Sequence, residues 1–164
     1  MLDIARYRNG MAMLAGAVNV ITTDGPRGKA EFTATAVCTV TDQPPTLLVC
    51  MNRSSYAHPF FVENGVLCVN LLAAVQQELS GVFANRDIPM EERFARTDWS
   101  PLETGSPAFA EALVCFDCRI ALVQEIGSHT IFFCEVLEMQ QSDAKPGLVY
   151  FNRGYHHLAA DKAA

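Results

Sequence analysis

The sequence predicts a mainly β protein with a few short helices, folded as a closed or partly closed antiparallel barrel. Six or so runs of β-branched and apolar residues are separated by short connections with turn chemistry, which is typical of such barrels. The regular alternation of helix and strand that marks a doubly wound fold is absent, and so is the GxGxxG fingerprint. If a nicotinamide nucleotide binds to this protein, it must therefore be bound without the GxGxxG motif.

Composition indicates one compact domain over residues 1–164. Hydrophobic residues make up 50% of the chain and charged residues only 18%, which argues against a disordered protein. The net charge of −6 and the lack of a Lys/Arg cluster make nucleic acid and acidic membrane surfaces poor partners. No apolar run approaches the roughly 20 residues of a membrane-spanning helix. Charged residues interrupt the first ten positions, where a signal peptide needs an apolar core, so we expect a cytoplasmic protein.

The positions of the six cysteines indicate that they pack as apolar side chains and do not bind a metal or form disulfides. Four of them lie inside apolar strand-like runs, where a reduced cysteine behaves as a small hydrophobic residue. These four are Cys38, Cys50, Cys68 and Cys134. Cys115 and Cys118 form a CxxC, but it falls in a strand pattern, and residues three apart on a strand point to opposite faces. A shared metal or disulfide is therefore not expected, and the four histidines show no metal-ligand spacing.

The first quarter of the chain predicts one helix and a β-hairpin. Apolar residues recur at helical spacing between Asp3 and Ala15, and Asp3 can cap the start of this helix. The β-branched run Ala17–Thr23 predicts a strand, and the DGPRG that follows it predicts a turn. A second strand, Ala30–Val40, then completes the hairpin.

The middle of the chain predicts two further strands and three short helices. Thr46–Met51 follows two prolines and is apolar at consecutive positions, so both faces of this strand should be covered. Ser54 or Ser55 should cap a helix that runs to about Asn64 and ends at Gly65. The remaining elements are a strand over Val66–Leu72, helices over Val75–Phe83 and Met90–Phe94, and a loop over Thr97–Pro107.

The last third of the chain predicts a β-meander. Leu113–Ile126 and Thr130–Met139 are two long strands joined by a hairpin-like connection at Gly127–His129. Gly147–Asn152 is a shorter final strand, and Arg153–Leu158 is a tail. Several strands are apolar on both faces although a barrel has only one inside. A partner subunit is the economical cover for the outside, so we expect a homodimer.

One stretch of the chain is suited to a phosphorylated aromatic ligand. The small side chains of Thr33–Ala36 leave the backbone open, so that a flat ring can lie against it. Asn52–Ser55 then supplies amide, guanidinium and hydroxyl donors where the next strand ends. Hydroxyl groups and free backbone N–H groups at a helix start form a ready anion site.

Five segments, spread over nearly the whole chain in one order, match a known family. They are GAVNVITTDGPRGKAEFTATAVCTVTDQPPTLLVCMN, LCVNLL, PMEERF, the GSH at Gly127–His129, and GLVYFNRGYH. Through them the chain resembles the short flavin reductases that supply reduced flavin to a partner monooxygenase. The resemblance implies a split β-barrel that dimerises, binds FMN or FAD, and oxidises NADH or NADPH. It leaves open which flavin and which nicotinamide nucleotide are used.

The resemblance also implies where the flavin lies. The wall along the flavin ring and ribityl chain would be formed by Thr33, Ala34, Thr35, Ala36 and Thr39. A threonine stands at position 39 where the family pattern has serine, and the hydroxyl is kept. Contacts with the ribityl chain and the phosphate would come from Asn52, Ser54 and Ser55.

The nicotinamide side is implied in the same way. His129 in the GSH segment resembles the histidine of the family's GDH segment and is the candidate catalytic residue, while Ser128 replaces the aspartate. The segment that frames nicotinamide and flavin would present Phe151, Arg153, Tyr155 and His156. Hydride transfer needs little more from the protein than ring stacking and hydrogen-bond donors, because the cofactor supplies the chemistry.

Two alternatives remain open at this stage. A non-catalytic flavin- or haem-binding module on the same barrel would bind its ligand without consuming NADH. A pyridoxamine-phosphate oxidase-like enzyme would hold FMN and consume oxygen with that substrate, and it would ignore NADH.

Overall fold

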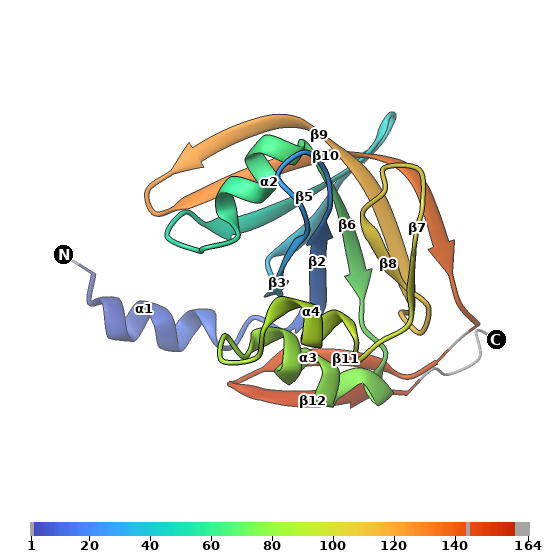
Figure 1. The fold of residues 1–164 in the computed structure, drawn as a ribbon. Helices are drawn as coiled ribbons and strands as arrows, with labels where there is room; N and C mark the ends of the chain where they lie inside the picture. Colours follow the sequence, from blue (N-terminus) through green and yellow to red (C-terminus); the bar gives the residue numbers. More distant parts are fainter. Residues whose placement is uncertain (1, 144, 160–164) are drawn as a thin grey trace.

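The chain folds around a curled antiparallel sheet (Figure 1). The computed structural model describes residues 2–143 and 145–159. The seven strands of the main sheet are β2 Asn19–Thr23, β3 Ala30–Ala34, β4 Val37–Asp42, β5 Pro45–Asn52, β6 Val66–Leu71, β9 Val114–Ile126 and β10 His129–Gln141, and their order is β3-β2-β6-β9-β10-β5-β4. The edge strands β3 and β4 are consecutive along the chain, and only residues 35–36 separate them. Three Cα steps reach at most roughly 11 Å, so the sheet curls until its edges approach each other there.

The predicted strand Ala30–Val40 is therefore two strands. β3 pairs with β2, whereas β4 pairs with β5 on the opposite edge, because the chain crosses from one edge to the other at Thr35 and Ala36. The predicted strand Ala17–Thr23 is also divided, since β1 Gly16–Ala17 belongs to a second sheet. The strand over residues 66–72 and the hairpin of two long strands around residues 127–129 are confirmed.

Two small sheets correct the predictions for the connecting segments. β1, β11 Gly147–Phe151 and β12 Gly154–Leu158 form one sheet, so the predicted tail Arg153–Leu158 is mostly a strand. Its hairpin turn is Asn152–Arg153, with φ of 46° and 61°, the left-handed pair that fits a tight hairpin. The predicted loop Thr97–Pro107 contains β7 Trp99–Pro101, which pairs with β8 Pro107–Phe109.

The helices lie where the sequence predicts them, but several begin or end at other residues than predicted. They are α1 Ile4–Met11, α2 His58–Asn64, a 3₁₀ turn η1 Ala74–Gln76 that leads into α3 Gln77–Ala84, and α4 Met90–Phe94. The Asp3 cap is confirmed, because its Oδ1 accepts a hydrogen bond from the N–H of Ala5 at 3.0 Å. Gly65 ends α2 with a φ of 67°, as predicted. The predicted cap at Ser54 or Ser55 is wrong, because turns continue through this segment and α2 begins only after Ala57.

Two apolar clusters lie on either side of the main sheet. Inside the curl, residues such as Ile21, Val49 and Phe132 pack around Phe61 of α2. On the other side, α3 and α4 cover the sheet, and Phe83 packs there at 5.2 Å from Phe109, measured between ring centroids. Two covered faces explain why several strands are apolar at consecutive positions.

Four of the six cysteines are buried, and two of those predicted to pack in the core are not fully buried. All six are free thiols. Cys115 and Cys118 are both buried, and they belong to different clusters, one on each side of the sheet. Cys38 is exposed on β4, so the prediction that it packs in the core is wrong, and Cys50 is only half-buried.

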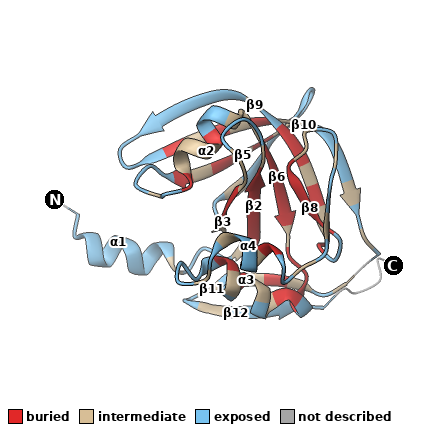
Figure 2. Cartoon of the chain, viewed as in Figure 1, coloured by how far each residue is buried: buried red, intermediate tan, exposed pale blue. Residues whose placement is uncertain are grey.

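Helix α1 and the outer half of the β9–β10 hairpin leave apolar side chains in solvent (Figure 2). α1 buries none of its residues, and it extends away from the sheets in Figure 1. Along the hairpin, Leu122, Val123 and Ile126 are exposed. In the described part of the chain, none of the helices combines the length and apolar character needed to cross a membrane.

Candidate functional site

The small-residue segment after β3 faces the hairpin formed by β11 and β12. Thr33, Ala34 and Thr35 line a cavity of about 210 Å³, here called the Tyr155 cavity, together with Tyr150 and Tyr155. The structure therefore brings together two groups that lie more than a hundred positions apart in the sequence. A wall of small side chains opposite two tyrosine rings can accept a flat aromatic group.

Polar contacts next to its turn connect the β11–β12 hairpin to two helices. The hydroxyl of Tyr155 lies 2.6 Å from Ser80 Oγ on α3, which fixes the tyrosine ring next to Tyr150, at a centroid distance of 5.2 Å. Arg153 Nη2 donates to Asn9 Oδ1 of α1 at 2.7 Å. The hairpin thus connects helix α3 on one side with helix α1 on the other.

The two remaining predicted residues of this hairpin lie side by side. The rings of Phe151 and His156 are edge to face at a centroid distance of 5.8 Å. Phe151 is half-buried and His156 is exposed. The guanidinium of Arg153 is engaged with α1, so of the four predicted residues it is Tyr155 that lines the Tyr155 cavity.

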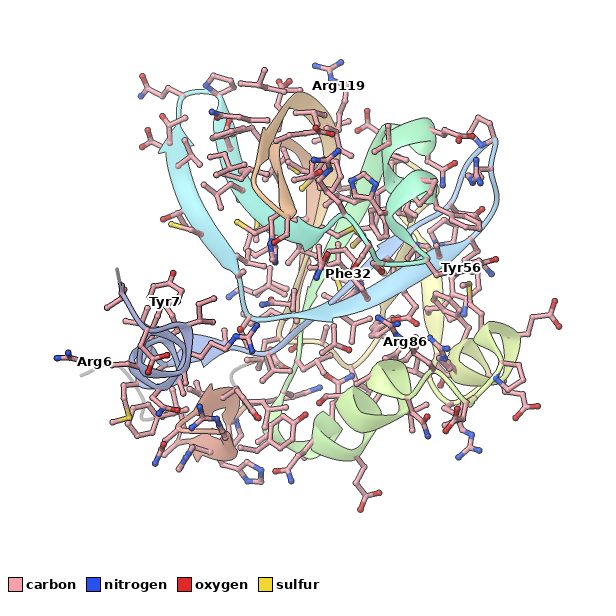
Figure 3. The ribbon with its side chains drawn as sticks, turned by 90° about the vertical axis from the view of Figure 1, so that its left-hand side faces the viewer. Arg6, Tyr7, Phe32, Tyr56, Arg86 and Arg119 are labelled. Carbon is pink, nitrogen blue, oxygen red and sulfur yellow. The ribbon has the colours of Figure 1, made fainter. Side chains whose placement is uncertain are left out.

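A second cavity, of about 570 Å³, opens on the other side of Thr33 and is called here the Arg86 cavity. Ser55, Tyr56 and Arg86 line it, between strand β3 and the segment that follows α3. Figure 3 shows Phe32, Tyr56 and Arg86 arranged around this region. Thr33 Oγ1 is buried and has no hydrogen-bond partner among the described residues. A buried hydroxyl, a second hydroxyl at Ser55 and the guanidinium of Arg86, which forms no ion pair with the described carboxylates, suit a ligand with hydroxyl and phosphate groups.

Arg86 was not among the predicted site residues. It follows α3 in the sequence FANRD, where Asn85 Oδ1 accepts from the N–H of Asp87 at 2.9 Å and turns the chain. A single arginine after a helix end carries no spacing signal, so only the fold places it opposite Ser55.

A buried ion pair also lies at the Arg86 cavity. Glu31 Oε1 pairs with Arg93 Nη1, and Arg93 Nε donates to the carbonyl of Ile88 at 2.7 Å. The Glu31 side chain is 1% exposed, and its second oxygen, Oε2, has no partner among the described residues. Burial raises the pKa of Glu31 to about 7, and this effect outweighs the lowering by Arg93. The PMEERF segment supplied Arg93 as part of the resemblance, but nothing in the sequence indicated Glu31 as its partner.

The structure separates the three residues expected at the ribityl chain and phosphate. Ser55 lines the Arg86 cavity, whereas Asn52 and Ser54 line another cavity, of about 500 Å³, together with Gly127 and Ser128. Asn52 Oδ1 accepts hydrogen bonds from both the N–H and the Oγ of Ser54, each at 2.9 Å. These two residues therefore stabilise the loop that carries Ser55.

His129 begins strand β10 and lies in register opposite Asn52. Its ring is exposed, and Nδ1 lies 2.9 Å from Ser128 Oγ, so the serine that replaces the expected aspartate still contacts the imidazole. The neighbouring Thr130 Oγ1 contacts Nε2 of His58 at 2.8 Å. Burial lowers the pKa of His58, which favours the neutral ring next to the tip of the β9–β10 hairpin.

Ala36 and Thr39 lie apart from the Tyr155 cavity. Ala36 is exposed, and its carbonyl accepts from the N–H of Cys50 at 3.0 Å where the chain crosses between sheet edges. Thr39 lines a mainly apolar cavity of about 640 Å³ together with Leu47 and Phe116. Of the five predicted wall residues, Thr33, Ala34 and Thr35 are brought together with the tyrosine hairpin.

Residues 11–159 match the model of the flavin reductase like domain. Over 154 residues the chain is 56% identical to the FMN reductase (NADH) RutF of Stutzerimonas stutzeri strain A1501, which covers 94% of this chain and 88% of that protein. RutF of Variovorax paradoxus strain S110, also named FMN reductase (NADH), is 54% identical over 159 residues, or 97% of this chain and 88% of that protein.

A solved structure shares the fold over almost the whole chain. BorF, the flavin reductase component of a bacterial two-component tryptophan halogenase, superposes with a TM-score of 0.89 at 30% identity and covers 98% of this chain and 100% of its own. The matched family model covers far more than half of the chain, and it includes the Tyr155 and Arg86 cavities. This chain belongs to the flavin reductase family.

Proposed function

We propose that this protein is an NADH-dependent flavin reductase that reduces FMN and releases it to a partner monooxygenase. The observation that carries this proposal is that the Tyr155 cavity and the Arg86 cavity meet at Thr33. A flat ring on one side of Thr33 and a phosphate on the other side correspond to the two ends of FMN. The names of the curated relatives, FMN reductase (NADH), support the same choice of flavin and hydride donor.

The residues around the two cavities have separate roles in this proposal. The flavin ring would lie along Thr33, Ala34 and Thr35, which line the Tyr155 cavity, and Ala36 and Thr39 would extend this wall beyond the cavity. Thr33 Oγ1, which lacks a partner in the described structure, would bond the ribityl chain. Ser55 and Arg86 would hold the phosphate, and Asn52 and Ser54 would position the Ser55 loop. Hydrogen bonds from a guanidinium to phosphate are charge-assisted and are correspondingly strong.

The hydride donor would be received from the solvent side of the ring. His129 would contact the nicotinamide end, with its ring oriented by Ser128, and Phe151, Arg153, Tyr155 and His156 would frame the two stacked rings. When bound, flavin supplies the electron-accepting chemistry, and hydride passes to it from nicotinamide C4. The protein contributes the stacking geometry, and it stabilises the negative charge that develops on the ring with donors.

A homodimeric split barrel is the quaternary arrangement that we propose. Helix α1 buries none of its residues in the chain, although Ile4, Tyr7 and Met11 form an apolar face. Exposed apolar residues on the outer β9–β10 hairpin provide a second unpartnered surface. A second copy that covers these faces would account for both.

One assay tests the proposed activity directly. NADH absorbance is followed in the presence and absence of FMN, FAD and riboflavin. We expect NADH loss that depends on added flavin and is fastest with FMN. Absence of flavin-dependent NADH loss, with FMN still bound, would instead support a flavin-binding module. Oxygen consumption with pyridoxamine phosphate but not NADH would support the oxidase-like alternative.

A further inference from the structure

A third cavity adjoins the Arg86 cavity and has a different chemistry. It has a volume of about 660 Å³ and is called here the Trp99 cavity. Tyr56 and Met90 line both cavities, so the two are neighbours that share a wall. The Trp99 cavity is lined by aromatic rings and by two basic side chains, Arg27 and Lys29. None of these residues is used by the proposed flavin reduction.

The basic groups lie directly over the aromatic rings. Lys29 Nζ is 4.1 Å from the centroid of the Trp99 ring and 5.1 Å from that of Phe94. The Arg27 guanidinium is 5.1 Å from the centroid of Phe60, and it is also paired with Glu63. Lys29 is half-buried, and in residues 2–143 and 145–159 it forms no ion pair with a carboxylate. A half-buried amino group without an ion-pair partner can attract an anionic ligand.

Tyr56 supplies an aromatic platform between the two cavities. Its side chain is 74% exposed, although it is a large aromatic residue on a short loop. Figure 3 shows Tyr56 at the edge of the region that contains Arg86. Its ring is tilted against Phe60 at a centroid distance of 5.5 Å, which supports one side of it. Exposed aromatic rings next to basic side chains are a common arrangement for binding a nucleotide base and its phosphate.

We propose that the Trp99 cavity binds the adenosine phosphate part of a dinucleotide, with Lys29 at the phosphate and Tyr56 stacked on adenine. The proposal rests on the proposed function, in which the flavin phosphate lies in the neighbouring Arg86 cavity. Glu91 is the carboxylate among the lining residues, and it lies exposed on α4. Because Arg27 is paired with Glu63, the basic group that this cavity offers to a ligand phosphate is Lys29, which forms no ion pair with Glu91 or another described carboxylate. Adenosine phosphate occurs in both FAD and NADH, and the experiment separates the two sources.

The chain offers a direct signal for this site, because Trp99 is its single tryptophan. AMP is titrated into the protein, and binding is followed by Trp99 fluorescence and by equilibrium dialysis with radiolabelled AMP. We expect saturable binding that Lys29→Met weakens about tenfold, through loss of a charge-assisted contact. Methionine keeps an apolar stem over Trp99, and circular dichroism checks that the variant is folded. Lys145→Met, which removes a lysine far along the chain, is the matched control and should bind AMP as the wild type does.

The same variants identify the source of the adenosine phosphate. If it belongs to FAD, Lys29→Met raises the dissociation constant of FAD and leaves that of FMN unchanged. If it belongs to NADH, the variant raises the KM for NADH and not the KM for reduced nicotinamide mononucleotide. Lack of AMP binding to the wild-type protein would overturn the proposal, as would equal loss of FMN and AMP affinity in Lys29→Met. Either result leaves flavin-dependent NADH oxidation intact, so it differs from a failure of the proposed function.

Discussion

Glu31 and Arg93 form an ion pair at the wall of the Arg86 cavity in which only one carboxylate oxygen is paired. The Arg93 guanidinium is also used by the Ile88 carbonyl, and Glu31 Oε2 remains without a partner in the part of the chain that the structure describes. Desolvation of this carboxyl exceeds its stabilisation by Arg93, so its pKa rises to about 7. Glu31 therefore titrates near neutral pH inside the fold.

The stability of the protein should depend on the ionisation of Glu31. The pKa of this carboxyl is about 7 in the folded chain and 4.5 as the ordinary value, so the folded state binds more protons between these limits. The stabilisation is fully present below pH 4.5 and is lost as pH rises through 7. We expect the free energy of unfolding to fall over this range, by on the order of 3 kcal/mol.

Glu31→Gln should remove this fall in the free energy of unfolding between pH 4.5 and 7. The amide keeps the shape of the side chain but cannot ionise. Urea denaturation at several pH values between 5 and 8 measures the effect. Glu92→Gln, an exposed change on α4, should retain the wild-type pH dependence. Parallel pH profiles for wild type and Glu31→Gln would show that Glu31 stays ionised against Arg93.

Arg86→Ala should weaken FMN binding about tenfold to a hundredfold and riboflavin binding much less. The expected loss corresponds to one charge-assisted contact with phosphate, about 1.5–3 kcal/mol, and riboflavin lacks the phosphate. Flavin fluorescence titration gives both dissociation constants. Arg96→Ala, an exposed change beyond α4, serves as the control for loss of a positive charge. An equal effect on FMN and riboflavin would place the phosphate elsewhere.

Ser55→Ala and Ser54→Ala should separate the two hydroxyls of the predicted phosphate segment. Ser55 lines the Arg86 cavity, so its loss should weaken FMN binding by about 1 kcal/mol. Ser54 Oγ is already used by Asn52, so its loss should act only through the loop and raise the dissociation constant less. Isothermal titration with FMN compares the two. A larger effect at Ser54 would indicate that the loop rearranges around the ligand.

Much of this fold follows from local patterns in the sequence. The β9–β10 hairpin, strand β6 and helix α4 were predicted because their signals are local, namely apolar runs and turn residues at the ends. The break at Thr35 and Ala36 was not predicted, because nothing in a run of small residues reveals that the chain changes sheet edges. Strand β12 was missed for a similar reason, since its polar, histidine-rich sequence pairs only because β11 lies beside it.

Some residues of the candidate site could be predicted from the sequence, and others became evident only from the fold. The resemblance supplied Thr33, Ser55 and Tyr155, and the structure brings each of them to one of two adjoining cavities. Arg86 and Glu31 lie outside any spacing that sequence could recognise, and they meet the site only through tertiary packing. Ser54 and Ser55 lie on different sides of one loop because the backbone turns through residues 52–58, and the sequence did not reveal these turns.

His129→Ala should raise the KM for NADH several-fold more than the KM for FMN. His129 stands at the hairpin tip beside Ser128, away from Ser55 and Arg86. Loss of one hydrogen bond from the imidazole to the nicotinamide should cost about 1 kcal/mol, or roughly fivefold in affinity. Steady-state kinetics with each substrate varied in turn measures the ratio. His157→Ala, whose ring contacts Gln77 on α3, is the matched control, and equal changes in both KM values at His129 would remove it from the nicotinamide side.

Negative charge on the exposed apolar face of α1 should dissociate the proposed dimer without unfolding the chain. Tyr7 and Met11 are 53% and 46% exposed, and Figure 3 shows Tyr7 on the helix away from the main sheet, so neither side chain is part of the core of the single chain. Tyr7→Glu combined with Met11→Glu would place two carboxylates in an apolar interface, where each is costly.

Sedimentation velocity should then show a dimer for the wild type and a monomer for the double variant, with similar thermal unfolding at low protein concentration. Arg6→Glu, a charge change on the adjacent helical position, controls for charge alone. Arg153 links α1 to the Tyr155 hairpin through Asn9, so the monomer should also show a raised KM for NADH. A wild-type protein that sediments as a monomer, or a double variant that remains dimeric, would show that α1 does not form the interface.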